Sequence, residues 1–223
     1  MRVNPSFQLT APKGFIVVEG LNGAGKTTLI KSIDHYLQQE RGKRTLITRE
    51  CGSPHSKLCG EVSKIVKHSE DIHILPRTEA FLFATDRAQH RDEVIAPALK
   101  RGEIVISDRY FYSSVAFQGY GRGLDPAWVM ALNKIAIAEL FPDFVILLDI
   151  SAEQADERMR KRSGEASELK HDRMEVDEMA FHQRVRQGFL VQAEQEAVPF
   201  LVLDATLSTE ALLDQLKPLL MQL

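Results

Sequence analysis

One segment of the sequence has the residue types and spacing to bind phosphate. Residues 20–27 read Gly-Leu-Asn-Gly-Ala-Gly-Lys-Thr, which matches the pattern GxxxxGK[ST] in full. Glycines let backbone N–H groups turn toward a phosphate, and a helix that starts there adds partial positive charge. We expect Lys26 to reach the β- and γ-phosphates of ATP and the Thr27 hydroxyl to bind Mg²⁺. The expected ATP-binding residues are Gly20, Leu21, Asn22, Gly23, Ala24, Gly25, Lys26, Thr27 and Thr28.

The elements around this loop have the periodicity of an α/β protein. A β-branched run at 14–18 precedes the loop, and one helical face follows it, made by Leu29, Ile30, Ile33, Tyr36 and Leu37. Further short strands are expected at 45–48, 104–107, 144–148 and 200–203, and helices at 78–99, 176–197 and around 212–220. Buried strands that alternate with helices predict a parallel sheet between two helical layers. We therefore expect one P-loop NTPase domain over 1–223, a three-layer sandwich with a five-stranded parallel sheet.

Composition excludes several other classes of protein. The 28 Lys and Arg against 31 Asp and Glu give a net charge of −3, which argues against a strongly basic nucleic-acid binder. Apolar runs such as 144–148 are far shorter than the roughly 20 residues that span a bilayer, and residues 1–13 do not resemble a secretion signal. Two cysteines provide neither a disulfide framework nor a zinc motif. We expect no membrane or nucleic-acid partner and a reducing cytoplasm.

Two further features bear on the kind of nucleotide enzyme. A GTPase needs the guanine-reading sequence NKxD, whereas the only Asn-Lys pair, at 133–134, continues without the acid. Residues 158–173 are charged and contain few large apolar side chains. They could be a solvated helix end and loop, or a mobile lid over the phosphates, with bounds of about 159–174.

At residues 15–28 and three later segments, the chain resembles the thymidylate kinase family of nucleoside monophosphate kinases. The later segments are Thr-Arg-Glu at 48–50, Phe-Ala-Thr-Asp-Arg-Ala-Gln-His at 83–90, and Asp-Arg-Tyr at 108–110 with Ala-Phe-Gln-Gly at 116–119. A weaker echo is Asp-Arg-Met-Glu at 172–175. The resemblance implies Mg²⁺-dependent transfer of the ATP γ-phosphoryl to dTMP, giving dTDP and ADP for dTTP synthesis. It also implies a cytoplasmic homodimer, for which the expected helix at 78–99 is a candidate contact.

The resemblance also implies how the acceptor nucleotide is held. Arg49 and Arg109 each follow an expected strand, at the sheet edge where ligands bind, and would contact the acceptor phosphate. Phe83 and Arg87 are four residues apart on one helix face, and would stack on thymine and bond its edge. Phe117 would crowd the sugar 2′ position. The remaining residues implied beside the acceptor are Asn22, Ser113 and Gln118.

Acidic residues are the candidates for binding the metal ion, and arginines are among the candidates for catalysis. Asp108 and Asp149 each end an expected strand, and either could organise Mg²⁺ through water. We favour Asp108 because Arg109 beside it resembles the family's active-site pair, and we expect Asp149 to be structural. The phosphate loop holds no arginine, and the resemblance then implies a catalytic arginine from the lid, Arg162 first and Arg160 second. The expected catalytic set is Lys26, Asp108, Arg109, Arg160 and Arg162.

Three residues depart from the family pattern. Asn22 stands where an acid is usual, Cys51 where Pro follows the Arg-Glu pair, and Met174 where an aromatic or branched residue is common. A cis bond is far more costly before Cys than before Pro, so we expect a trans bond between Glu50 and Cys51. Cys51 could have a lowered pKa beside an arginine, although an ordinary thiol is the simpler interpretation. Two alternatives stay open: a kinase for another pyrimidine deoxynucleotide such as dUMP, and a nucleotide-binding switch without efficient transfer.

Overall fold

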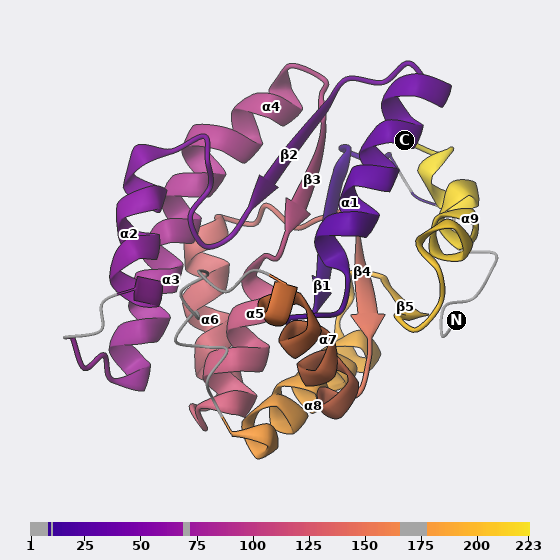
Figure 1. Ribbon diagram of the computed structural model, residues 1–223. Coiled ribbons are helices and arrows are strands. Elements are labelled where there is room, and N and C mark those ends of the chain that lie inside the picture. Colours follow the sequence, from indigo (N-terminus) through magenta and orange to yellow (C-terminus); the bar gives the residue numbers. More distant parts are fainter. Residues whose placement is uncertain (1–8, 10, 69–71, 166–177) are drawn as a thin grey trace.

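A five-stranded parallel sheet forms the centre of the molecule (Figure 1). The computed structural model describes residues 9, 11–68, 72–165 and 178–223. The strand order is β2-β3-β1-β4-β5, and every pairing is parallel. The strands are β1 (Phe15–Gly20), β2 (Thr45–Arg49), β3 (Ile104–Asp108), β4 (Phe144–Asp149) and β5 (Phe200–Asp204). This sheet confirms the predicted fold class, and each expected strand is present with ends shifted by one or two residues.

Helices cover both faces of the sheet. On one face α1 packs on β1, β2 and β3, with α9 beside α1; on the other, α5 and α8 contact the central strands and each other. The α-helices are α1 (Lys26–His35), α2 (Lys57–His68), α3 (Pro76–His90), α4 (Ala96–Lys100), α5 (Phe111–Ser114), α6 (Pro126–Ile137), α7 (Ala152–Glu165), α8 (Met179–Gln195) and α9 (Thr209–Leu220). Three π-helical segments extend helices: η1 (Tyr36–Glu40), η2 (Arg91–Ile95) and η3 (Val115–Gly121).

The long helix expected over 78–99 is one continuous helical stretch of three parts. It starts at Pro76 in α3, passes through η2 and ends at Lys100 in α4. Pro97 lies inside this stretch, two residues after η2, and the helix continues past it to Lys100. Residues 176–177 of the helix expected over 176–197 lie outside the described residues, and α8 covers Met179–Gln195 of the remainder.

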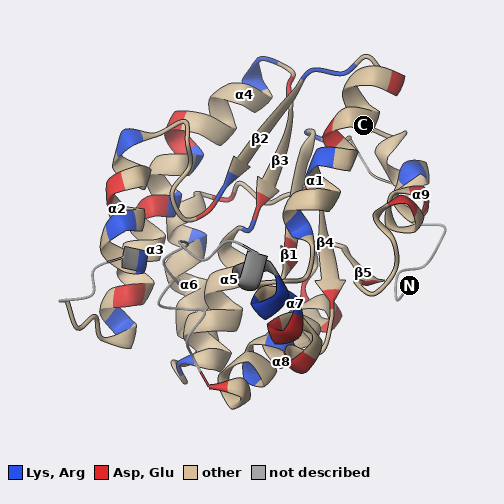
Figure 2. Ribbon diagram, viewed as in Figure 1, with Lys and Arg blue, Asp and Glu red and all other residues tan. Residues whose placement is uncertain are grey.

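The sheet is apolar along its strands and charged at their carboxyl ends. Every residue of β1 is buried, and β4 is buried apart from its last residue. Acidic residues colour the ends of β3 and β4 in Figure 2, close to the start of α1. Because parallel strands end at the same edge, this arrangement gathers Asp108, Asp149 and the phosphate loop at one side of the sheet. Within the described ranges, no helix is long and apolar enough to cross a bilayer.

Candidate active site

The phosphate loop joins β1 to α1 with a backbone that requires glycine. Gly20 and Gly23 have φ values of +140° and +84°, and a Cβ on either would lie within 2.6 Å of a carbonyl oxygen. The Lys26 ammonium donates to the carbonyl oxygens of Leu21 at 3.0 Å and Gly20 at 3.3 Å. The lysine therefore lies inside the loop, at the N-terminus of α1, where a phosphate chain would bind.

A hydroxyl and a carboxylate meet beside this loop. Thr27 Oγ1 donates to Asp108 Oδ2 at 3.4 Å. Mg²⁺ prefers oxygen ligands and is usually held by one or two protein groups together with substrate phosphates and water. This donor pair fits such an ion. Asp149 is placed differently, because Arg186 binds both of its oxygens, at 2.7 and 2.9 Å.

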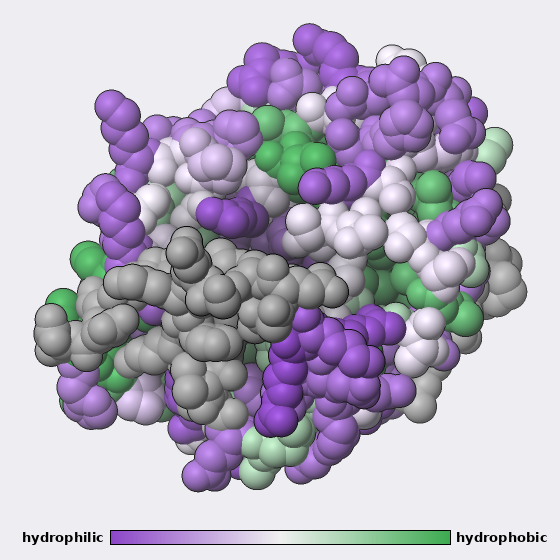
Figure 3. Space-filling model, viewed as in Figure 1, coloured by the Kyte–Doolittle hydropathy of each residue, from purple (hydrophilic) through white to green (hydrophobic). Residues whose placement is uncertain are grey.

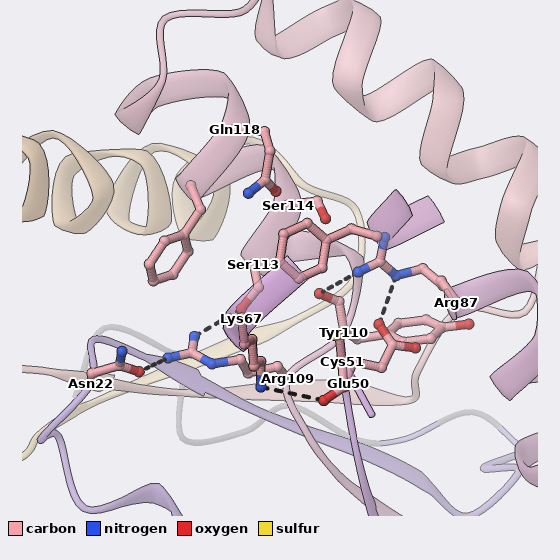
Figure 4. Close-up of a pocket in the computed structure, with 12 residues that line it drawn as sticks. Asn22, Glu50, Cys51, Lys67, Arg87, Arg109, Tyr110, Ser113, Ser114 and Gln118 are labelled. Carbon is pink, nitrogen blue, oxygen red and sulfur yellow. Dashed lines mark hydrogen bonds and ion pairs between the residues drawn. The ribbon is translucent and has the colours of Figure 1, made fainter. Parts of the chain in front are cut away.

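A cavity with about 520 Å³ of empty space opens next to the loop (Figure 4). It contains every residue expected to contact the acceptor except Arg49. The lining residues are Asn22, Glu50, Cys51, Lys67, Phe83, Arg87, Arg109, Tyr110, Ser113, Ser114, Phe117 and Gln118.

Arg109 connects the cavity with the phosphate loop. Its guanidinium donates to Asn22 Oδ1 at 2.6 Å and to Ser113 Oγ at 2.9 Å, as Figure 4 shows. It also lies over the ring of Phe117, with 5.1 Å between the guanidinium carbon and the ring centroid. Its backbone has a φ of +73°, a left-handed conformation that non-glycine residues rarely adopt. One cation thus faces both the donor loop and the acceptor cavity.

The other end of the cavity is a buried polar network around Arg87. This guanidinium donates to Glu50 Oε2 at 2.7 Å, to the side-chain oxygen of Asn133, and at 3.5 Å to the carbonyl oxygen of Tyr110. His90 Nδ1 lies 3.0 Å from the second oxygen of Glu50. Arg87 is therefore held in one orientation while it lines the cavity.

The backbone of the loop after β2 differs from expectation. The peptide bond between Glu50 and Cys51 is cis, so the expected trans bond is wrong. Contacts hold both sides of it, because Glu50 binds Arg87 and the Gly52 N–H donates to Asp86 Oδ1 at 3.1 Å. Local preference argued for trans, but the folded surroundings decide the conformation.

The next features of this loop are the thiol of Cys51 and the side chain of Arg49. Burial raises the pKa of the Cys51 thiol to about 11, with a further contribution from Asp86, so a lowered pKa is excluded. Arg49 is exposed at the end of β2, and its Nε donates to the Gly52 carbonyl oxygen at 3.1 Å. Its backbone pairs with Asp108, but its side chain is not part of the cavity lining.

The expected lid lies only partly within the described residues. Residues 159–165 belong to α7, whereas 166–174, including Met174, lie outside the described residues, as does the side chain of Arg162. Arg160 is exposed and pairs with Asp156 at 2.9 Å. Arg158 donates to the Ala205 carbonyl oxygen at 3.0 Å.

Sequence reasoning missed three charged residues: Glu50 and Lys67, which line the cavity, and Glu19, which lies behind it. Lys67, near the end of α2, lines the cavity, and its Nζ donates to the Cys51 carbonyl oxygen at 3.4 Å. Glu19 lies fully buried at the end of β1, where burial raises the pKa of its carboxyl to about 7 and Arg109 opposes that shift. An acid inside an otherwise apolar strand was a signal for Glu19, whereas Lys67 resembles any other surface lysine in the sequence.

Comparison with known proteins agrees with this geometry. A family model described as thymidylate kinase matches residues 18–216. A thymidylate kinase of Nitratidesulfovibrio vulgaris strain DP4 is 41% identical over 197 residues, 88% of this chain and 87% of that protein. One of Clavibacter sepedonicus is 44% identical over 191 residues, 86% of each chain. The crystal structure of thymidylate kinase from Ehrlichia chaffeensis superposes with a TM-score of 0.71 at 28% identity, over 92% of this chain and 97% of that one. With matches over nearly its whole length, this chain belongs to the thymidylate kinase family.

Proposed function

We propose that this protein transfers the γ-phosphoryl group of ATP to dTMP, giving ADP and dTDP for dTTP synthesis. An acceptor phosphate oxygen attacks the γ-phosphorus in line, and the bond from that phosphorus to the β,γ-bridging oxygen breaks. The observation that carries this proposal is Arg109, which faces the phosphate loop through Asn22 and the acceptor cavity through Ser113. Family membership supports the same reaction.

The donor is bound at the start of α1. Backbone N–H groups of residues 20–28 surround its phosphates, and Lys26 adds a point charge at the β- and γ-phosphates. Thr27 and Asp108 would hold Mg²⁺, Thr27 directly and Asp108 through water. The bound ion would neutralise charge on the β- and γ-phosphates as ADP leaves.

The acceptor fills the cavity in one orientation. Its phosphate lies at Arg109, beside the phosphate loop, and its base lies between Phe83 and Arg87. Ser113 and Gln118 complete the polar contacts, Phe117 excludes a 2′-hydroxyl, and Arg49 would swing in from its exposed position. The Arg87 side chain is already fixed by its buried partners, so little conformational entropy is lost when the base binds.

Closure of the lid completes the site in this proposal. Arg162, or Arg160 in its place, would reach the transferring phosphoryl group from residues 159–174 and neutralise its charge. Arg160 pairs with Asp156 across one turn of α7, an exposed contact that costs little to break. Exclusion of water by the lid would favour transfer to dTMP over hydrolysis of ATP.

We also propose a cytoplasmic homodimer that uses α2, α3 and α6. Large apolar side chains are exposed on these helices, among them Leu58 and Ile65 on α2, Phe81 on α3 and Ile135 on α6. Hydrophobic atoms show at the left edge of Figure 3, where α2 and α3 lie in Figure 1. Light scattering during gel filtration tests this, because a monomer at all concentrations would contradict it.

An acceptor panel tests the proposed reaction. ADP release from Mg-ATP is measured with dTMP, dUMP, dCMP, dGMP, dAMP and UMP under identical conditions. We expect kcat/KM for dTMP to exceed every other value at least about tenfold, since a base site built from fixed polar groups rejects poor matches. Preference for dUMP would favour the alternative acceptor. ATP binding without ADP release on any acceptor would favour the switch protein.

A further inference from the structure

Glu19 lies one layer behind the residues that line the acceptor cavity. Its carboxylate is 0% exposed, at the end of β1. Glu19 Oε1 accepts the backbone N–H groups of Tyr110 at 2.9 Å and Ser113 at 3.1 Å, and Oε2 accepts the Ser113 hydroxyl at 2.6 Å. Arg109 Nη1 lies 3.8 Å from Oε2. The carboxylate therefore contacts Arg109 itself and two residues that follow it, Tyr110 and Ser113.

The backbone of Arg109 is held on both sides in its left-handed conformation. Its N–H donates to the Val18 carbonyl oxygen at 3.0 Å, and its own carbonyl oxygen accepts the Ser107 hydroxyl at 2.7 Å. The next N–H, of Tyr110, donates to Glu19. Non-glycine residues persist at such φ values only where their surroundings fix them. Glu19 fixes the backbone on the C-terminal side of Arg109, because it accepts the Tyr110 N–H.

The Ser113 hydroxyl hydrogen-bonds to both Glu19 and the Arg109 guanidinium, and so connects the two side chains. A serine hydroxyl has one proton to donate. Ser113 gives that proton to Glu19 Oε2, so its oxygen can only accept from Arg109 Nη1, at 2.9 Å. The second guanidinium nitrogen is held by Asn22. The direction of the hydroxyl, and with it the place of the guanidinium, depends on an acceptor at Oε2.

We propose that Glu19 is a positioning residue that holds Arg109 ready for the phosphate of the acceptor nucleotide. The inference deepens the proposed function and rests on it, because Arg109 matters for the acceptor only if a nucleoside monophosphate fills the cavity. Glu19 itself is not in the cavity lining and acts through Arg109 and Ser113. Loss of Glu19 should therefore weaken binding of the acceptor's phosphate and leave binding of the acceptor's base and of ATP unchanged.

The test variant is Glu19→Gln, which keeps the size of the side chain. An amide nitrogen at the Oε2 position would donate to Ser113 and turn the hydroxyl proton away from it, toward Arg109. We expect kcat/KM for dTMP to fall about 10- to 100-fold, as for a misplaced positioning group. The KM for ATP and the inhibition constant of thymidine, which lacks the phosphate, should each change less than about twofold.

Asp143→Asn is a matched control at the opposite end of β1. The Asp143 carboxylate also accepts backbone N–H groups, those of Lys13, Gly14 and Phe15 at 2.7 to 2.9 Å, but it is not in the cavity lining. This variant should lower the melting temperature and leave the KM for dTMP unchanged. A thermal melt of Glu19→Gln then separates a folding defect from a positioning defect.

A double-mutant cycle identifies the route of the effect. If Glu19 acts through Arg109, Glu19→Gln should lower kcat/KM less than about twofold in an Arg109→Ala background. A full effect in that background, an equal loss for ATP and dTMP, or no loss at all would overturn the proposal. If Glu19→Gln fails to fold, Ser107→Ala is the second test, because it removes the hydroxyl that donates to the Arg109 carbonyl oxygen. This variant should lower kcat/KM for dTMP by a smaller factor and leave the KM for ATP unchanged. Absence of that loss would equally overturn the proposal.

Calorimetry of dTMP binding distinguishes the two proposals. Wild-type protein that binds dTMP but forms no dTDP contradicts the proposed function, while weaker dTMP binding by Glu19→Gln still supports the role of Glu19. If wild type and Glu19→Gln both turn over dTMP with the same KM, the proposed role of Glu19 is contradicted and the proposed function is not. Absence of dTMP binding by the wild type contradicts both.

Discussion

Asp86 makes protein stability depend on pH in a way that one substitution should remove. Its side chain is buried in α3, beside the acceptor cavity, where Oδ1 accepts the Gly52 N–H. The other oxygen, Oδ2, has no hydrogen-bond partner within the part of the chain that the structure describes. Burial, and then the charge of Glu50, raise the pKa of Asp86 from 3.8 to about 6. The perturbation is Asp86→Asn, which keeps the shape and the bond to Gly52.

The sign and the size follow from this pKa. The folded protein holds the Asp86 proton more tightly than the unfolded chain does, so ionisation costs folding free energy as the pH rises from about 3.8 to 6. A pKa of about 6 in place of 3.8 corresponds to about 3 kcal/mol once the pH exceeds both values. Between about pH 4 and pH 8, the free energy of unfolding of the wild type should fall by about 2 to 3 kcal/mol relative to Asp86→Asn.

Urea unfolding of both proteins at several pH values measures this difference. Other buried acids, such as Glu19, are present in both proteins, so their contributions to the pH dependence of the unfolding free energy cancel. Any change in stability that the new amide causes at every pH also cancels, because only the change with pH is compared. A difference in unfolding free energy that stays within about 0.5 kcal/mol over the whole range would show that Asp86 is not a buried acid of raised pKa.

Three further predictions concern the cavity, the thiols and the lid. Lys67→Met should raise the KM for dTMP about tenfold and leave the KM for ATP unchanged, because it removes a cation from the cavity that binds the dTMP dianion. The control Lys64→Met, on the exposed side of α2, should change neither KM. Equal effects of the two substitutions on the KM for dTMP would contradict a role for Lys67 in the cavity. Cys51 and Cys59 are buried with raised pKa values, so neither should react with a chromogenic disulfide reagent at about pH 8 until urea unfolds the protein; reaction in the native state would contradict this. Arg162→Ala should lower kcat by at least ~10³, and near-normal turnover would refute its catalytic role.

Local patterns in the sequence were sufficient to predict the fold. The phosphate loop depends on glycines, a lysine and a threonine at fixed spacing, and its strand and helix lie on either side of it in the sequence. Runs of β-branched residues identified all five strands, since strands buried on both faces have near-continuous apolar sequences. The alternation of these strands with helices was then sufficient to predict the parallel sheet.

Contacts between distant segments could not be predicted in the same way. The cis bond at Cys51 lies in a loop held by α3, and no local preference indicates it. Lys67 reaches the cavity only because α2 packs on α3. The contacts of Glu19 join the end of β1 to α5, 94 positions further along the chain.

The central claim is that Arg109 and the cavity around it accept dTMP for phosphoryl transfer. The most direct measurement supplies ATP labelled in its γ-phosphate, with Mg²⁺ and dTMP, and separates the products. We expect label in dTDP, in a one-to-one ratio with ADP, and loss of that product in Arg109→Ala. Label released as inorganic phosphate, or retained in ATP while dTMP remains unchanged, would contradict it.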